Sequence, residues 1–161
     1  MIVLILNIIL GCSLLIITYQ DFKDRSIHLA WLIAVFLCAI ALLWIQGQAL
    51  SDLISPVLFV IIVLFVLWIY LSLKQKRFLN PLKNHIGLGD VFFFLAITPL
   101  FNLHNYMLFF ITGMLLSLIV SGLFTKKNRM IPLAGILALY LTILKIGSFF
   151  LEKDIFKDSL L

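Results

Sequence analysis

The sequence predicts an all-α, polytopic integral membrane protein with about six transmembrane helices. Three observations support this fold class. The chain is 64% hydrophobic and only 12% charged, its mean hydropathy is +1.22, and long apolar runs recur along its 161 residues. Soluble domains are about half apolar and about a quarter charged, so a soluble globular class is excluded. Because no change in composition marks a linker, we expect residues 1–161 to form a single membrane-embedded domain.

The first three expected spans cover residues 2–19, 29–45 and 53–73. Crossing the hydrocarbon core takes about 20 apolar residues, with about 17 as the practical minimum, and each of these runs reaches it. The first run lacks the positively charged start and the small-residue cleavage site of a secretory signal, so we expect a retained helix. Cys12 and Cys38 lie within apolar runs and form no C-x-x-C pair, which favours packing roles.

The last three expected spans cover residues 90–103, 106–124 and 131–150. The run from 90 to 103 is short and contains Pro99. We therefore expect a helix that is kinked, tilted or shielded by its neighbours rather than fully exposed to lipid. Lys145 falls inside the last span, where its ammonium either extends to the membrane surface or pairs internally.

Basic residues alternate between the connections and so predict an orientation. The connections after the first, third and fifth spans contain, in turn, Lys23 and Arg25; Lys74, Lys76, Arg77 and Lys83; and Lys126, Lys127 and Arg129. The connections after the second and fourth spans contain none. Because positive residues favour the cytoplasmic side, the odd-numbered connections are expected in the cytoplasm and both termini outside.

Three acidic residues fall on the expected cytoplasmic side: Asp21, Asp24 and Asp90. Asp21 directly follows the first span and Asp90 directly precedes the fourth, so both are expected at the same depth on the same face. Two neighbouring carboxyl groups do not easily ionise together. One then keeps a proton to donate to a peptide carbonyl, while the other accepts a proton from water. Asp21 and Asp90 are therefore a candidate catalytic pair.

Each acid also has an ordinary structural interpretation. Asp90 precedes the run "VFFFLAI" and fits a helix cap. Asp21 fits a surface ion-pair cluster with Lys23 and Arg25. Both interpretations stay open when each residue is considered alone, and the expected meeting of the two acids at one face favours catalysis.

The residues around the acids leave further alternatives. Gly87 and Gly89 fit a close backbone approach to an extended substrate, and they equally fit a turn before a helix. His28 and His85 share the expected face of the acids, but their spacing matches no metal-binding motif. We therefore expect headgroup-level histidines, no metal and no organic cofactor.

Three segments carry a family likeness. "YQDFKDRSIHLAW" resembles the first active-site segment of type IV prepilin peptidases, with Asp21, Arg25 and Ile27 at the family's spacing. "GLGDV" is similar to the second segment, the GxGD motif, with Asp90 as its acid. "RMIPLAGIL" resembles a later Ile-Pro segment, with Pro132 as the match. The likeness covers nearly the whole chain as a peptidase domain, without the cysteine-rich methyltransferase region of longer members.

The resemblance implies an aspartic endopeptidase in the inner membrane of a bacterial cell. Such an enzyme removes the short basic leader of type IV prepilins or pilin-like secretion subunits at the cytoplasmic face. Asp21 and Asp90 would be catalytic, with active-site support from Gly87, Gly89 and Arg25. The implied partners are a prepilin or pseudopilin-like substrate and the lipid bilayer, with no nucleic acid.

The chain departs from the family pattern at three positions. His28 stands where Pro is usual, Phe92 where Lys is common, and Gly135 where a second Pro often follows. These departures leave both acids intact and concern substrate preference and activity. The alternatives are a catalytically silent assembly subunit of a pilus or secretion machine, and a small proton-coupled transporter or channel. A transporter would need more polar residues deep within the spans than this sequence contains.

Overall fold

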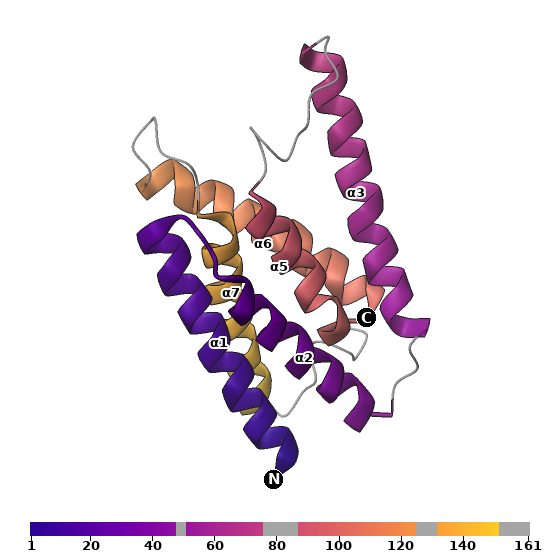
Figure 1. Cartoon of the computed structure of the whole chain (residues 1–161), viewed down its shortest axis with the longest axis vertical. Helices are drawn as coiled ribbons and strands as arrows, with labels where there is room; N and C mark the ends of the chain where they lie inside the picture. The colour runs from indigo at the N-terminus through magenta and orange to yellow at the C-terminus, as the bar shows by residue number, and fades with distance from the viewer. Residues whose placement is uncertain (48–50, 76–86, 125–131, 152–161) are drawn as a thin grey trace.

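The computed structural model describes residues 1–47, 51–75, 87–124 and 132–151, and within these ranges it contains helices and no strand (Figure 1). The elements are, in chain order, α1 (Ile2–Asp24), α2 (Leu29–Ile45), α3 (Ser51–Gln75), α5 (Leu88–Ile97), the short 3₁₀ helix η1 (Thr98–Leu100), α6 (Leu103–Phe124) and α7 (Leu133–Leu151). The six α-helices occupy the positions of the six expected spans. The all-α fold class is therefore confirmed.

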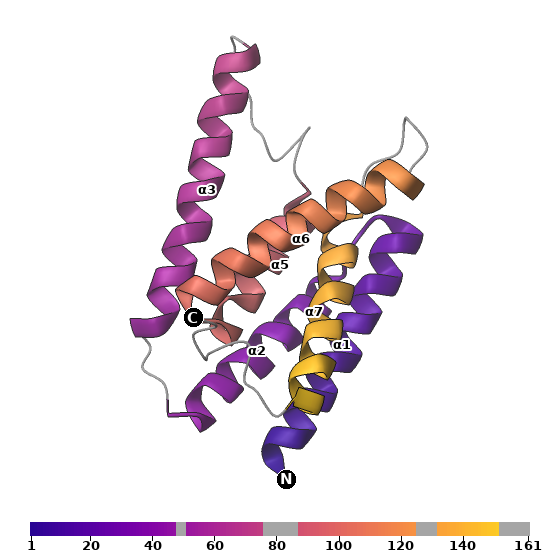
Figure 2. The ribbon, with the colours of Figure 1, turned by 180° about the vertical axis from the view of Figure 1, so that it is seen from behind.

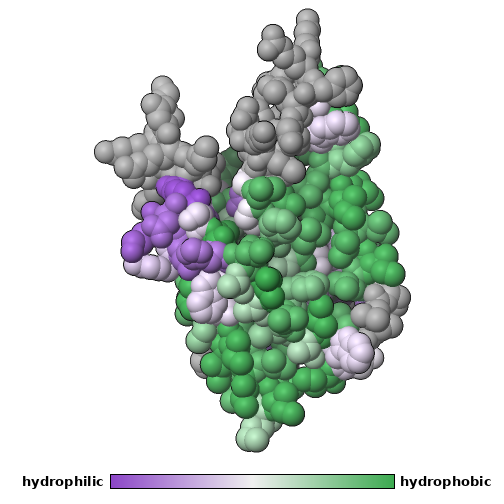
Figure 3. Space-filling view, viewed as in Figure 1, coloured by the Kyte–Doolittle hydropathy of each residue, from purple (hydrophilic) through white to green (hydrophobic). Residues whose placement is uncertain are grey.

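The surface and the helix lengths identify a membrane protein. Three segments are long and apolar enough to cross a membrane: Ile2–Asp24, Asp52–Tyr70 and Leu103–Leu123. The other helices are apolar but shorter. Large apolar side chains are exposed on all six α-helices, and hydrophobic surface covers most of the face in Figure 3. Soluble monomers rarely expose such continuous apolar patches. That all six helices cross the membrane stays a prediction.

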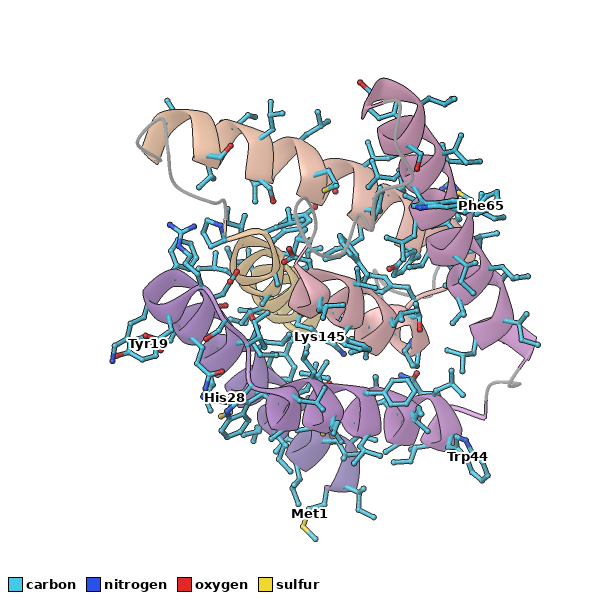
Figure 4. The ribbon with its side chains drawn as sticks, turned by 45° about the horizontal axis from the view of Figure 1, so that its top comes forward. Met1, Tyr19, His28, Trp44, Phe65 and Lys145 are labelled. Carbon is cyan, nitrogen blue, oxygen red and sulfur yellow. The ribbon has the colours of Figure 1, made fainter. Side chains whose placement is uncertain are left out.

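Hydrophilic surface gathers at the end of the bundle where α1 terminates (Figure 3). The exposed residues there include Lys23, Asp24 and Arg25. One turn earlier, Tyr19 points outward, and its ring centroid lies 5.3 Å from the Lys23 ammonium (Figure 4). Trp44 also points outward, from the apolar surface of α2. Among the described residues, the end of the bundle at which α1 terminates is therefore distinctly polar.

α1 is longer than the first expected span, because the helix continues beyond residue 19 to Asp24. Asp21 consequently lies within the last turn of the helix and not after it. Arg25 ends the helix in the left-handed conformation, with φ of 54°, and its backbone N–H donates to the Asp21 carbonyl at 3.2 Å.

The fourth expected span is interrupted at Pro99, as its sequence predicts. Since Pro99 has no N–H, the Leu95 carbonyl loses its usual helical donor. The N–H of Thr98 donates to it instead, and so does the Thr98 hydroxyl at 2.8 Å. The neighbouring Phe94 carbonyl accepts a hydrogen bond from the buried Tyr106 hydroxyl at 3.0 Å. These bonds satisfy backbone groups that water does not reach, which allows α5 to end inside the bundle.

α1 packs against α7 along most of its length and against α2 on another side (Figures 1 and 2). The core residues of these three helices include Leu10, Leu14, Ile17, Val35, Ala39, Leu137 and Leu141. The Lys145 ammonium of α7 donates to the Asn7 amide oxygen of α1 at 3.0 Å and lies among the helices (Figure 4). Lys145 is thus paired internally, one of its two expected placements.

α3 lies on the opposite side of the bundle, where it packs on α6, η1 and α5 (Figure 1). The short α5 contacts α2, α3 and α7. Its first turn, which contains Asp90, is thereby held close to the beginning of α7 and to the end of α1.

Candidate active site

Asp21 is a buried acid, although it lies near the polar end of α1. Its residue surface is only 6% exposed. Its carboxylate oxygen Oδ2 accepts a hydrogen bond of 2.6 Å from the backbone N–H of Gly135 in α7. A buried charged group is costly unless it is paired or hydrogen-bonded, and this bond meets that requirement. Arg25, one turn further on, interacts electrostatically with the same carboxylate.

Asp90 lies in the first turn of α5 and binds the same region of α7. Its carboxylate oxygen Oδ1 accepts a hydrogen bond of 3.0 Å from the backbone N–H of Ala134. α5 begins after Gly87, whose carbonyl accepts the Asp90 backbone N–H at 3.0 Å. The Asp90 carboxylate also interacts with the Gly87 backbone, which is how an acid supports the first turn of its own helix. The structure therefore combines the cap interpretation with a tertiary contact that a simple cap would not make.

The two acids meet at consecutive amides. Ala134 donates to Asp90 and the next residue, Gly135, donates to Asp21. The two carboxylates are close enough to interact electrostatically with each other. The structure thus brings the two acids of the predicted pair together, and three helices contribute to the meeting point. Their placement at the cytoplasmic face stays a prediction.

The beginning of α7 is suited to hold negative charge. The first N–H groups of a helix have no partner within the helix, and the helix dipole is positive at that end. Carboxylates at such a position form charge-assisted hydrogen bonds. The C-terminal end of α1 disfavours a negative charge on Asp21. The N-terminal end of α7 stabilises that charge and offsets this effect. The sequence analysis did not identify this contribution of α7.

Gly135 permits the close contact between α7 and α1. A Cβ atom at this position would lie 3.0 Å from both Cβ and Oδ2 of Asp21, and 3.2 Å from Cδ2 of Phe22. Gly135 is also one of the departures from the family pattern, since Pro is frequent there. Proline has no N–H to donate. In this chain the departure supplies the hydrogen bond that holds Asp21.

The two glycines of the "GLGDV" segment allow close contacts, one within this segment and one with Ile27 of the first family-like segment. A Cβ atom at Gly87 would lie 2.9 Å from the Asp90 Oδ2 atom, so the glycine leaves room for the carboxylate. A Cβ atom at Gly89 would lie 3.2 Å from Ile27 Cδ1. The close backbone approach anticipated for these glycines is made to the protein's own side chains.

The other residues singled out from the sequence lie around this meeting point or on the surface. Pro132 is buried directly before α7, and its carbonyl accepts the Ile136 N–H at 3.1 Å. His28 is exposed at the start of α2, and its backbone N–H donates to the Gln20 side chain at 3.3 Å. Phe92 is 46% exposed on α5. His85 and most of the basic connection residues fall outside the described ranges.

The described part of the chain contains no group of three or more His, Cys, Asp or Glu residues that could hold a metal ion. The expectations of no metal and no cofactor stay predictions.

Thr18 was not identified from the sequence. It is buried one turn before Asp21, and its hydroxyl lies 2.9 Å from the Leu14 carbonyl and 3.3 Å from the Gly135 carbonyl. It therefore links α1 to the residue that binds Asp21. Its position three residues before an acid is the signal that the sequence offers.

An apolar cavity of about 240 Å³ adjoins Asp90 on the side of α3. Its walls come from α3, α5, α6 and α7, and include Val63, Phe94, Met114 and Leu133. Asp90 is the charged residue among the described residues that line it. No sequence signal distinguishes these apolar wall residues from those that face lipid.

Comparison with protein-family models identifies the family of the chain. Residues 8–122 match the model of the type IV leader peptidase family. The matched region contains Asp21 and Asp90, and it ends before the α7 residues that bind them. No curated protein and no solved structure matches the chain.

Proposed function

Because the chain belongs to the type IV leader peptidase family, we propose that it is an aspartic endopeptidase that removes the short basic leader of type IV prepilins or pilin-like secretion subunits. The observation that carries this proposal is the binding of both carboxylates by consecutive amides of α7. Two carboxylates that interact with each other are the groups that an aspartic protease needs.

The proposed chemistry uses the two acids in complementary protonation states. The ionised carboxyl group takes a proton from a water molecule, whose oxygen attacks the peptide carbonyl carbon. The protonated group donates to the carbonyl oxygen as negative charge develops there. Collapse of the tetrahedral intermediate breaks the C–N bond, and the leaving nitrogen receives a proton from the pair. The two carboxyl groups interact electrostatically, so the two roles are assigned to the pair and not to either residue alone.

The amides of Ala134 and Gly135 orient the pair. Each binds one carboxylate oxygen, Oδ1 of Asp90 or Oδ2 of Asp21, which fixes the position of the second oxygen relative to the substrate. A misplacement of about 1 Å can reduce a rate by about 10²-fold, so this orientation is expected to increase the cleavage rate by a large factor. Arg25, which interacts with Asp21, is proposed to support the same arrangement.

The proposed placement is the inner membrane of a bacterial cell, with six spans, both termini outside and the acids at the cytoplasmic face. The alternation of basic residues between the connections supports this orientation. The substrate is a single-pass protein whose basic leader stays in the cytoplasm while its apolar helix enters the bilayer. The exposed departures at His28 and Phe92 are proposed to affect substrate preference and not the chemistry.

Co-expression with pilin-like precursors tests the proposal. Leader removal is followed as a mobility shift on a gel for the wild type, Asp21→Asn, Asp90→Asn and the control Asp24→Asn. Asp24 is exposed and lies in the same helical turn as Asp21, so its replacement changes the charge but not the pair. We expect cleavage by the wild type and the control, and none by the other two variants. Cleavage that survives either Asp21→Asn or Asp90→Asn contradicts the two-aspartate mechanism, and no cleavage by the wild type favours a silent assembly subunit.

A further inference from the structure

Thr18 of α1 contacts the same residue of α7 that binds Asp21, and the proposed chemistry does not use it. Its hydroxyl lies 2.9 Å from the Leu14 carbonyl of its own helix and 3.3 Å from the Gly135 carbonyl of α7. Other described hydroxyls that bond to the carbonyl four residues earlier are those of Ser13, Thr112, Ser117 and Thr142. Among these residues, Thr18 is the one whose hydroxyl also lies within hydrogen-bond distance of the backbone of a second helix.

Neither partner needs this contact to satisfy its own hydrogen bonding. The Thr18 hydroxyl has a single proton, and the Leu14 carbonyl is its nearer acceptor. In an α-helix the carbonyl of residue 135 accepts the N–H of residue 139, which leaves a second lone pair for Thr18. The bond to Leu14 fixes the rotamer of Thr18 and so holds its oxygen against α7. The contact between the helices therefore sets their relative position and does not rescue a buried polar group.

Thr18 and Asp21 hold residue 135 at two points. They lie three residues apart on α1 and therefore share one face of the helix. Asp21 Oδ2 accepts the Gly135 N–H at 2.6 Å, and the Thr18 hydroxyl lies 3.3 Å from the carbonyl of that glycine. A helix can turn about one hydrogen bond, whereas contacts at both ends of one residue fix its orientation. The same orientation directs the N–H of the preceding residue, Ala134, toward Asp90.

The packing around Gly135 makes this second contact useful. Ala134 and Ala138 are fully buried, and no side chain separates Gly135 from α1. Small residues let two helices in a membrane approach closely. They also form a smooth surface, with few ridges to stop one helix from turning or sliding against the other. The hydroxyl contact restricts this movement at the turn that binds the acids.

Resting on the proposed function, we propose that Thr18 is a positioning residue for the acid pair, whose hydroxyl holds the first turn of α7 in the orientation that binds both carboxylates. It acts through Gly135 and not on the substrate. Loss of the hydroxyl lets this turn move and misplaces the acids. The chemical step therefore becomes slower, while substrate binding is kept.

Two substitutions separate the hydroxyl from the methyl group of Thr18. Thr18→Val removes the hydroxyl and keeps the branched shape, and Thr18→Ser keeps the hydroxyl and removes the methyl group. The matched control is Thr142→Val in α7. Thr142 is 8% exposed and Thr18 is 9% exposed, and the Thr142 hydroxyl donates at 2.8 Å to the Ala138 carbonyl of its own helix. This control removes the same kind of hydroxyl about two helical turns from Gly135.

The kinetic test uses purified full-length protein in detergent and a precursor with a lysine-containing leader followed by about 20 apolar residues. We expect Thr18→Val to lower kcat at least about 10-fold with KM nearly unchanged, the pattern of an interaction that matters only in the transition state. Thr18→Ser and Thr142→Val should keep most of the wild-type kcat. If Thr18→Val does not accumulate, Thr18→Ala and Thr142→Ala form the corresponding pair, with the same expected contrast.

An unchanged kcat in Thr18→Val overturns the proposal, and so does a rise in KM alone, because the residue would then affect substrate binding. An equal loss in Thr18→Ser also overturns it, since packing of the methyl group would explain the effect. An equal loss in Thr142→Val does the same, because any buried hydroxyl of the bundle would then matter as much.

Hydrogen exchange tests the position of α7 without reference to activity. The N–H groups of Ala134 and Gly135 are bonded to the two acids, and mass spectrometry follows deuterium uptake in fragments that cover residues 132–136. We expect uptake about 5-fold faster in Thr18→Val, as for the loss of one hydrogen bond, and unchanged in Thr142→Val. Unchanged uptake in Thr18→Val contradicts the proposed hold on α7. A wild type that cleaves no precursor defeats the proposed function, and the exchange rates then decide alone whether Thr18 holds the helix.

Discussion

At Gly135 the first turn of α7 approaches α1 so closely that no side chain fits between the two helices. The Cβ of an alanine would meet Cβ and Oδ2 of Asp21 at 3.0 Å. The Asp21 Cβ cannot yield without a movement of the helix itself. The contact that excludes a side chain is also the contact through which the Gly135 N–H reaches the carboxylate at 2.6 Å. Helix packing and site geometry therefore both depend on the absence of a Cβ atom at residue 135.

We predict that Gly135→Ala lowers the free energy of unfolding by about 1–3 kcal/mol, the usual cost of overpacking. It should also lower cleavage activity by about 10²-fold, because Asp21 is displaced from its partner. The matched control is Gly147→Ala in the same helix, where a Cβ meets nothing within 4 Å. This control should raise stability by about 0.5–1 kcal/mol, since alanine favours a helix more than glycine does. Thermal unfolding in detergent measures the stability of the two variants, and the cleavage assay measures their activity. Equal effects of the two substitutions would refute the role of the contact.

Asp21 and Asp90 could be selected from the sequence because charges at the ends of apolar runs are conspicuous and because the charge alternation assigns them to one face. The groups that hold them could not be selected. They are backbone amides, which every residue except proline has, and only the tertiary contact of α7 with α1 and α5 shows which two are used. Gly135 was visible in the sequence only as a departure from a family pattern.

At the scale of the element, α5 shows how a helix too short to cross a membrane unaided is held in place. It ends at Ile97 because Pro99 removes a donor, and the freed carbonyls are taken up by side-chain hydroxyls. The break was predictable, since proline disrupts helices whatever their context. The compensation by Tyr106 was not, because it depends on how α6 returns against α5. Tyr106 is fully buried, and its position at the start of an expected span does not show which carbonyl it meets.

We predict that Tyr106→Phe lowers the free energy of unfolding by about 1–2 kcal/mol, because the Phe94 carbonyl loses its donor in a region without water. The matched control is Tyr140→Phe. The Tyr140 hydroxyl lies 3.0 Å from the Thr112 hydroxyl, which keeps the Leu108 carbonyl as an acceptor at 2.6 Å after the change. The control should therefore cost clearly less. Chemical or thermal unfolding in detergent measures the free energy of unfolding of both variants. A loss of stability for Tyr140→Phe as large as that for Tyr106→Phe would argue against the proposed compensation.

At the scale of the whole molecule, the amino-acid composition was sufficient to predict the fold class. A chain that is 64% hydrophobic can only bury its surface in lipid, and a helix is the simplest element that satisfies its own backbone there. Helix positions followed from the lengths of the apolar runs. The arrangement of the helices did not follow, because apolar residues that face lipid and those that face a neighbour look alike in a membrane sequence. Val63 and Ile62 are adjacent examples, one beside the cavity and one on the surface.

The orientation in the membrane gives a prediction at this scale. In a background with Cys12→Ala and Cys38→Ala, single cysteines are introduced as Asp52→Cys and Asp24→Cys, both at exposed positions. A membrane-impermeant maleimide added to intact cells should label the cysteine at 52, and should label the cysteine at 24 only after permeabilisation. The reverse pattern would place the acids outside the cell and contradict leader removal in the cytoplasm.

The pairing of Asp21 with Asp90 is tested most directly by the cleavage rates of purified wild type, Asp21→Asn, Asp90→Asn and the double variant on one precursor, with Asp24→Asn as the control. Groups that act as a unit lose nearly everything when either is removed. We expect each single variant to be slower by about 10⁴-fold or more, the double variant to be no slower than either single one, and the control to match the wild type. Substantial cleavage by either single variant, or a double variant whose loss is the product of the two single losses, would contradict a shared catalytic role for these two carboxylates.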